Sequence, residues 1–364
     1  MALKIGIVGL PNVGKSTLFN ALTRTKGAQA ANYPFCTIEP NVGIVEVPDE
    51  RLQKLAELVH PERVVPAAIE FVDIAGLVKG ASKGEGLGNQ FLAAIREVDA
   101  ICHVVRVFEG GDIIHVEGSV HPKRDREIIE TELMLSDLQG LQKRMPKIEN
   151  AARIGDKEKA AEFAVCQKME AALQSGQLAS TVELSKEEKP IAAGLQLLTS
   201  KPFVYAANVA EQQLASLKTD ELKTQLGLPS FADLVLISAK IEEDLQDLSP
   251  SEAQEFLSSL DVTSSGLDLL IKAAYHALGY ITYFTAGEKE VRAWTIVKGY
   301  KAPQAAGVIH TDFERGFIRA ETIGYADYLT AGSEAKVREA GKLRVEGKEY
   351  IVADGDIMHF RFNV

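Results

Sequence analysis

A glycine-rich loop near the start of the chain constrains its fold more than any other feature. Residues 9–16 read Gly-Leu-Pro-Asn-Val-Gly-Lys-Ser and match the pattern G-x-x-x-x-G-K-[ST]. An apolar run from Leu3 to Val8 precedes the loop, and a helical pattern from Ser16 to Leu22 follows it. A strand, a glycine loop and a helix in this order direct backbone N–H groups at phosphate oxygens. The loop therefore predicts an α/β nucleotide-binding domain.

The residues of this loop have separate expected roles. Lys15 supplies a positive charge to the β- and γ-phosphates, and Ser16 offers its hydroxyl to Mg²⁺. The other nucleotide contacts expected from the loop are Asn12, Val13, Gly14 and Thr17.

Further apolar runs predict more strands of the same sheet. They lie at residues 67–72, 100–107, 203–207 and 234–237, and helical stretches separate them. Short apolar strands that alternate with helices are typical of a doubly wound parallel sheet. The first domain is therefore expected to hold residues 1–124 and 203–280.

About 95 residues separate the strand ending near Val107 from the one starting at Phe203, far more than a simple crossover needs. Apolar residues recur every three or four positions along this span, which predicts two long helices and a shorter one. We expect an inserted antiparallel coiled-coil arm over residues 125–202, with its tip at Gly155-Asp156. Pro146 lies inside the first helix and should kink or end it.

From Tyr280 onward the pattern becomes that of a small, mostly β domain over residues 281–364. Four stretches alternate or are rich in β-branched and aromatic residues, as strands are. These stretches are residues 282–285, 291–297, 348–352 and 359–362.

Composition limits the partners and the cellular compartment. The chain has 40 Lys and Arg against 51 Asp and Glu, a net charge of −11, which argues against a protein that coats nucleic acid electrostatically. The three cysteines lack metal-ligand spacing, which fits free thiols in a reducing compartment. No stretch of 18 apolar residues exists, so we expect no membrane span and a cytoplasmic protein.

Asp73-Ile74-Ala75-Gly76 follows a predicted strand and forms a D-x-x-G element. In such elements the carboxylate reaches Mg²⁺, usually through water, and the glycine N–H senses the γ-phosphate. Asp73 and Gly76 are therefore candidate catalytic residues. Thr37 lies in the loop between the two motifs and could complete the Mg²⁺ shell.

Asn208-Val209-Ala210-Glu211 follows another predicted strand, where GTPases of this class carry N-K-x-D. The substitutions Val209 and Glu211 damage guanine readout, since a longer carboxylate cannot occupy the same position as Asp. We expect Asn208 to pair with adenine N6 and N7 instead, as amides commonly do. Ser238-Ala239-Lys240 follows the next predicted strand. It resembles the turn that supplies the final base contacts along the chain in such GTPases.

These motifs together resemble the YchF/Obg-like ATPase family. The stretches that carry the resemblance are GLPNVGKST at 9–17, NYPFCTIEP at 32–40, DIAGLVKGASKGEGLGN at 73–89 and HTDFERGFIRAE at 310–321. The resemblance covers essentially the whole chain. It implies an ATP-hydrolysing P-loop protein of the translation-factor class with a nucleotide domain, a helical arm and a ubiquitin-like TGS domain.

The resemblance also implies partners. These are ATP, the ribosome as its large subunit or as the whole particle, and rRNA or tRNA. Nothing in the sequence demands a dimer, so a monomer is expected.

Leu77 stands where many relatives have a water-orienting glutamine, so another group should handle the attacking water. Histidine suits this task near neutral pH. His103 lies inside a strand and is expected in the core. The resemblance points to His115, which follows Gly110-Gly111, and the alternative is an ordinary surface-loop histidine.

Asn12 resembles an asparagine of K⁺-dependent relatives whose side-chain carbonyl helps to hold a monovalent cation beside the phosphates. The alternative is that Asn12 only shapes the turn. The sequence favours neither, so K⁺ is a second candidate cofactor beside Mg²⁺.

Two other functions remain open on the sequence alone. One is a GTPase of the same class, against which Val209 and Glu211 argue. The other is a non-enzymatic ribosome or RNA adaptor built around the C-terminal domain. Its candidate contact face is Lys298, Lys301, His310, Arg315 and Arg319.

Overall fold

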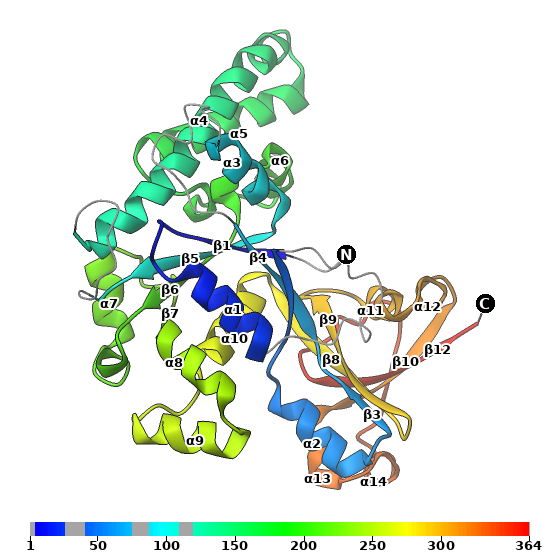
Figure 1. The fold of residues 1–364 in the computed structure, drawn as a ribbon. Coiled ribbons are helices and arrows are strands. Elements are labelled where there is room, and N and C mark those ends of the chain that lie inside the picture. The colour runs from blue at the N-terminus through cyan, green and yellow to red at the C-terminus, as the bar shows by residue number, and fades with distance from the viewer. Residues whose placement is uncertain (1–3, 26–40, 75–86, 109–118, 364) are drawn as a thin grey trace. The chain divides into compact units, whose positions relative to one another are not determined.

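A computed structural model describes residues 4–25, 41–74, 87–108 and 119–363 (Figure 1). The chain divides into two compact units. Among the described residues, the first unit holds 4–25, 41–43 and 70–270, and the second holds 44–69 and 271–363. Of the described helices, none is long and apolar enough to cross a membrane.

The first sheet has six strands in the order β2-β4-β1-β5-β6-β7. Its strands are β1 (Lys4–Val8), β2 (Val42–Glu46), β4 (Ala68–Asp73), β5 (Ala100–Arg106), β6 (Phe203–Asn208) and β7 (Asp233–Ile237). The pairs β1–β4, β1–β5, β5–β6 and β6–β7 are parallel. The doubly wound sheet expected from the sequence is confirmed, while β2 was not predicted.

Helices follow the strands of this sheet in the alternation that a parallel sheet requires. They are α1 (Lys15–Thr25), α3 (Leu87–Glu97), α7 (Thr219–Leu226), α8 (Ala239–Asp244), α9 (Pro250–Ser259) and α10 (Gly266–Ala277). Strand β5 is buried at every residue, as a parallel strand covered on both faces should be. Its register with β1 and β6 places the carboxyl ends of these strands at one edge of the sheet.

The helical insert consists of α4 (Pro122–Arg153), α5 (Lys157–Gln174) and α6 (Glu188–Leu195), as predicted. Leu141, Ile148, Cys166 and Met169 are buried where α4 and α5 pack together. Helix α4 continues seven residues beyond Pro146, so this proline does not end the helix. The other expected effect of Pro146, a kink, stays a prediction.

The turn between α4 and α5 is at the predicted tip. Gly155 has a φ of 102°, which favours glycine, and Asp156 accepts hydrogen bonds from the N–H groups of Glu158 and Lys159 as the N-cap of α5.

The second sheet has the order β11-β10-β12-β8-β9-β3 and is mixed. Its strands are β3 (Arg63–Val65), β8 (Tyr280–Ala286), β9 (Glu290–Val297), β10 (Phe317–Gly324), β11 (Arg344–Glu346) and β12 (Asp356–Phe362). Helices α11 (Ala302–Ile309), α12 (Thr311–Arg315), α13 (Tyr325–Ala331) and α14 (Glu334–Glu339) belong to the same unit. Tyr283, Phe317 and Phe360 lie in its core.

One predicted strand of this domain is wrong. Residues 348–352 form no strand, and only Ile351 makes an isolated bridge, to Lys301. Tyr350 turns its hydroxyl to Asp356, 2.7 Å away. The aromatic and β-branched pattern here therefore reflects anchoring of a turn rather than a strand.

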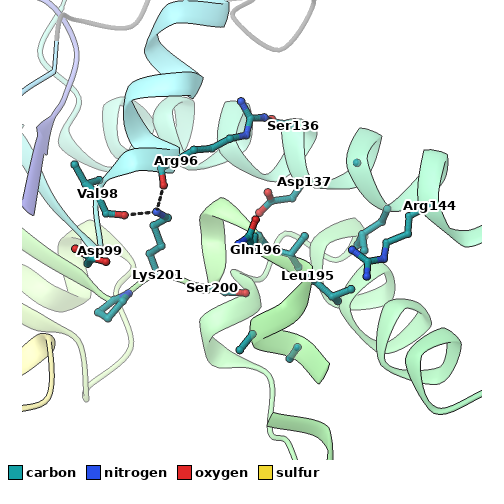
Figure 2. A pocket seen from close by; sticks show the side chains of 16 residues that line it. Arg96, Val98, Asp99, Ser136, Asp137, Arg144, Leu195, Gln196, Ser200 and Lys201 are labelled. Atoms are coloured by element: carbon teal, nitrogen blue, oxygen red, sulfur yellow. Dashed lines mark hydrogen bonds between the residues drawn. The ribbon is translucent and has the colours of Figure 1, made fainter. Parts of the chain in front are cut away.

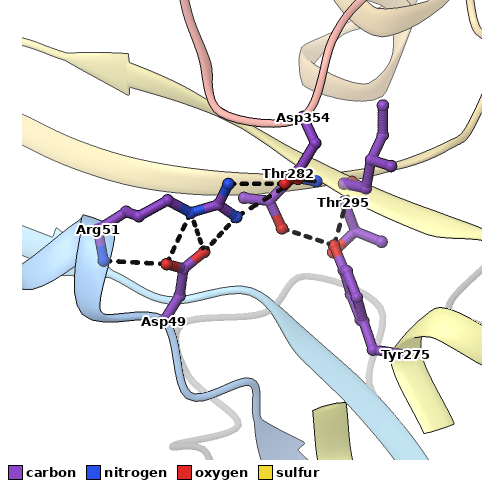
Figure 3. A network of polar contacts seen from close by, with 7 residues as sticks. Asp49, Arg51, Tyr275, Thr282, Thr295 and Asp354 are labelled. Atoms are coloured by element: carbon purple, nitrogen blue, oxygen red, sulfur yellow. Dashed lines mark hydrogen bonds and ion pairs between the residues drawn. The ribbon is translucent and has the colours of Figure 1, made fainter. Parts of the chain in front are cut away.

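A network of charges holds α2 (Glu50–Val59) in the second unit (Figure 3). The guanidinium of Arg51 contacts Asp49 and Asp354, each at 2.7 Å. Asp354 also accepts the N–H of Thr282 at 2.9 Å. Burial alone would raise the pKa of Asp354, but the bonds from Arg51 and Thr282 lower it below its ordinary value.

The packing of α2 places residues 44–69 in the second compact unit, whereas the sequence-based boundaries place them in the nucleotide-binding domain. The three-part division over 1–124 with 203–280, 125–202 and 281–364 stays a prediction.

Candidate functional site

The glycine loop has a backbone conformation that its sequence makes possible. Gly14 has a φ of 100°, and a Cβ at this position would lie 2.4 Å from Nδ2 of Asn208. A side chain at this position is therefore disfavoured by both strain and space. Asn12 has a φ of 62°, a left-handed conformation that asparagine tolerates better than most residues. The loop leads directly into α1, which begins at Lys15.

Lys15 is buried, and its ammonium is turned back onto the loop. Nζ donates a hydrogen bond to the carbonyl of Leu10 at 2.8 Å. Burial lowers the pKa of Lys15, and the nearby carboxylate of Asp73 opposes this shift. The loop thus holds a cation whose desolvation a bound phosphate would offset.

Ser16 and Asp73 lie together although 57 residues separate them in the sequence. The Ser16 hydroxyl donates to Oδ2 of Asp73 at 3.3 Å. Asp73 ends β4, pairs in register with Ile7, and donates its own N–H to the carbonyl of Asn41. A hydroxyl and a carboxylate are the oxygen donors that Mg²⁺ prefers.

Among the described residues, no group of three His, Cys, Asp or Glu could hold a metal ion. The Ser16–Asp73 pair brings a hydroxyl and a carboxylate together, and these oxygens fit a hard cation such as Mg²⁺. Thr37, the other predicted ligand, lies outside the described residues, and so do Gly76, Leu77 and His115.

Asn208 links the glycine loop to the turn at Ser238. Its Nδ2 donates to the carbonyl of Val13 at 2.9 Å, and its Oδ1 accepts the N–H of Ala239 at 3.2 Å. The side chain is 6% exposed. Each end of the amide therefore helps to hold the two loops together. Because the amide keeps a second N–H and a second oxygen lone pair, the expected pairing of Asn208 with adenine stays a prediction.

The other residues of the base-reading turn differ in exposure. Val209 is 1% exposed and packs with Leu222 and Leu226, so its side chain is not available to cover a base. Ser238 is also buried and caps α8, with its Oγ accepting the N–H of Ile241. Glu211 is partly exposed at the start of a short 3₁₀ helix. Glu211 is thus the side chain of this group that is best placed to meet a ligand.

Val13 and Thr17 complete the set of predicted loop contacts. Val13 is buried, and its carbonyl is the one that Asn208 bonds. Thr17 lies half-buried in the first turn of α1. The expected contact of both with phosphate, through backbone N–H groups, stays a prediction.

A buried group of polar side chains on β6 and α4 was missed by the sequence analysis. The Tyr205 hydroxyl donates to Glu130 at 2.8 Å, and Arg126 lies 3.4 Å from the same carboxylate. His103 is buried beside Tyr205, which confirms the expected core position. Burial, with the charges of Arg126 and Lys15, lowers the pKa of His103 to about 3. The spacing of Arg126 and Glu130 on α4 was the available signal.

The contact face proposed for the adaptor function is partly committed to ion pairs. Lys301 pairs with Glu349 at 2.6 Å and Arg319 with Glu321 at 3.8 Å. His310 Nδ1 lies 3.3 Å from Asp312. These contacts favour a solvated surface over an open cationic face.

Comparison with known proteins then decides the family. Residues 4–132 match a family model described as 50S ribosome-binding GTPase, and residues 280–363 match one described as YchF-GTPase_C, a protein of unknown function. The protein called ribosome-binding ATPase YchF in Bacillus subtilis is 56% identical over 367 residues and 100% of both chains. The chain belongs to the YchF family.

Other YchF proteins agree over the same length. The Escherichia coli O157:H7 protein of the same name is 52% identical over 364 residues, again 100% of both chains. The solved structure of the Schizosaccharomyces pombe YchF GTPase has a TM-score of 0.89 and 43% identity, covering 99% of this chain and 98% of that one. The YchF fold therefore includes both sheets and the helical insert.

Proposed function

We propose that this chain is a ribosome-binding ATPase that hydrolyses ATP to ADP and phosphate. The observation that carries the proposal is the 56% and 52% identity, over complete chains, to proteins with that name. The glycine loop supports it, because Lys15, Ser16 and Asp73 lie together as a nucleoside triphosphate site needs. Ribosome binding would place the protein in the cytoplasm. We propose that it acts as a monomer, because nothing in the sequence demands a dimer.

In this proposal water attacks the γ-phosphorus and the bond to the β-phosphate oxygen breaks. Lys15 neutralises charge on the transferred group, and the Gly76 N–H senses the γ-phosphate. His115 handles the attacking water, because Leu77 has no hydrogen-bonding group for the task. Phosphate release would free the loops that γ-phosphate orders.

Mg²⁺ is the proposed cofactor. Ser16 would hold it, with Asp73 beside the site and Thr37 as a further ligand. A bound Mg²⁺ supplies positive charge to the phosphates. Asn12 would either hold K⁺ or shape the turn, and a titration with and without K⁺ separates these roles.

We further propose that ATP is preferred over GTP. Val209 is buried where a lysine would cover guanine, and Glu211 replaces the aspartate that reads guanine. A GTPase is the second candidate function, because the Schizosaccharomyces pombe protein of known structure and one matched family model are both described as GTPases.

Calorimetric titration of the full chain with ATP and with GTP, in Mg²⁺, tests the proposal. We expect tighter ATP binding by about tenfold or more, since one well-formed hydrogen-bond pair discriminates by roughly 1–3 kcal/mol. Equal or tighter GTP binding would favour the second candidate. Ribosome pelleting with 50S subunits and 70S particles, with rRNA and tRNA as competitors, would identify the partner.

A further inference from the structure

A cavity of about 740 Å³ lies in the first unit, at the root of the helical insert (Figure 2). Its walls come from the end of α3, the middle of α4 and the segment 192–202 that leads from α6 to β6. This volume is typical of small-molecule sites. None of the residues assigned above to the nucleotide site lines this cavity.

The two carboxylates that line the cavity are engaged in holding the protein together. Asp137 accepts the N–H groups of Leu198 and Thr199 at 2.8 and 2.9 Å and the Thr199 hydroxyl at 2.7 Å. Asp99 accepts the N–H of Lys4 at 2.8 Å. Asp137 therefore has most of its acceptor capacity directed into the protein, whereas the bond from Lys4 occupies one acceptor site of Asp99.

Two of the three cations in the walls are also engaged. Arg144 forms an ion pair with Glu162 at 2.6 Å. Lys201 donates from Nζ to the carbonyls of Arg96 and Val98, where α3 ends. These groups shape the cavity, and their hydrogen bonds leave them less able to recognise a ligand.

Arg96 is the cation with the weakest contacts. Its exposed side chain extends along the cavity toward Ser136, and the guanidinium lies 3.5 Å from the Ser136 hydroxyl, at the limit of a hydrogen bond (Figure 2). The Ser200 hydroxyl, which also lines the cavity, has no hydrogen-bond partner within the described part of the chain. The guanidinium of Arg96 and the hydroxyl of Ser136 thus lie together, and the Ser200 hydroxyl adds a further donor to the walls.

Part of the wall is apolar, and part of it is open. Val98, Leu195 and Leu197 line it. Gly140 lies inside α4, where glycine weakens a helix, and no atom lies within 4 Å of the position its Cβ would take. Packing of α4 therefore does not require this glycine, but a side chain there would project toward the cavity.

We propose that this cavity binds a small phosphate monoester with an apolar body. A guanidinium matches phosphate oxygens in geometry and charge. The hydroxyls of Ser136 and Ser200 can serve further oxygens of a tetrahedral group, which a planar carboxylate could not present in the same way. The apolar wall accommodates the ester portion.

The test is calorimetry on the full chain with phenyl phosphate as the probe and Mg·ADP saturating the nucleotide loop. We expect Arg96→Gln to weaken binding by about tenfold or more. Gly140→Leu should abolish it, because the leucine side chain enters the cavity. Two changes on the same helix, Gln142→Leu and Arg153→Gln, serve as matched controls and should leave the affinity unchanged. Equal melting temperatures would show that all four variants are folded.

Three results would overturn the proposal. The first is no binding of phenyl phosphate to the wild-type chain at millimolar concentration. The second is binding that Arg96→Gln and Gly140→Leu leave intact but that Lys15→Ala removes, which would place the probe in the nucleotide loop. The third is equal affinity for phenol, which would show that the phosphate is not recognised.

Discussion

The nucleotide loop and the α2 network treat a cation in opposite ways: Lys15 is buried, whereas Arg51 is half-buried. Lys15 donates to one carbonyl, and burial lowers its pKa. Arg51 donates hydrogen bonds to the carboxylates of Asp49 and Asp354. Burial opposes the charge of Arg51, but these bonds raise its pKa above the ordinary value. Paired charge in the second unit stabilises the fold. In the first unit, burial disfavours the positive charge of Lys15. A ligand that carries negative charge would offset this cost.

The largest expected effect is on ATP turnover at the nucleotide site. His115→Ala should lower ATP turnover by about 10²-fold or more, the usual loss for an acid–base group. ATP affinity should hardly change, because the group acts in the transition state. Phosphate release with K⁺ and ribosomes present measures this, and His121→Ala is the matched control. Wild-type turnover in His115→Ala would remove this residue from the mechanism.

Arg51→Ala should affect stability rather than chemistry. It leaves Asp49 and Asp354 without their shared partner, so the free energy of unfolding should fall by about 2 kcal/mol. Urea unfolding measures the change. Arg63→Ala is the control, since its ion pair with Glu290 is longer, at 3.9 Å, and exposed. An equal loss in both variants would mean that the network is no more than a surface contact.

Glu211→Asp should reduce the preference for ATP over GTP by about tenfold, because the shorter carboxylate restores guanine readout. Titration with both nucleotides measures the ratio, and Gln212→Asn is the control. Val209→Lys, by contrast, should destabilise the fold, since Val209 is 1% exposed. An unchanged ratio in Glu211→Asp would exclude Glu211 from base recognition.

A further prediction concerns the dependence of stability on pH. The pKa of His103 is about 3 when folded against an ordinary 6.5, so between these values the unfolded chain binds a proton that the folded chain does not. The free energy of unfolding should therefore fall as pH falls, by up to about 1.4 kcal/mol per unit. His103→Gln should flatten this slope between about pH 6 and 4, whereas the exposed His276→Gln should not. An unchanged slope would show that His103 is protonated when folded.

Local patterns predicted the parts of the site that depend on backbone geometry. The strand, glycine loop and helix around Lys15 follow from spacing, and the pairing of Ser16 with Asp73 follows from motif order. The core position of His103 follows from the apolar strand around it. These features are local, or they follow from the fixed edge of a parallel sheet.

Features that depend on tertiary packing were not predicted. The burial of Val209 results from packing against α7, and the bridging of Asn208 results from two loops meeting in space. The buried charges of α4 do not appear in a hydrophobic pattern at all. Tyr350 has the pattern of a strand residue but anchors a turn through Asp356.

The most direct test of the account is ATP hydrolysis by the wild-type chain and by Lys15→Ala, with Mg²⁺, K⁺ and ribosomes present. We expect Lys15→Ala to lower phosphate release by about 10²–10³-fold, the scale for loss of one preorganised charge-stabilising group. Its free energy of unfolding should match that of the wild type, and Asp73→Asn should behave alike. Wild-type turnover in Lys15→Ala, or its unfolding, would contradict the account.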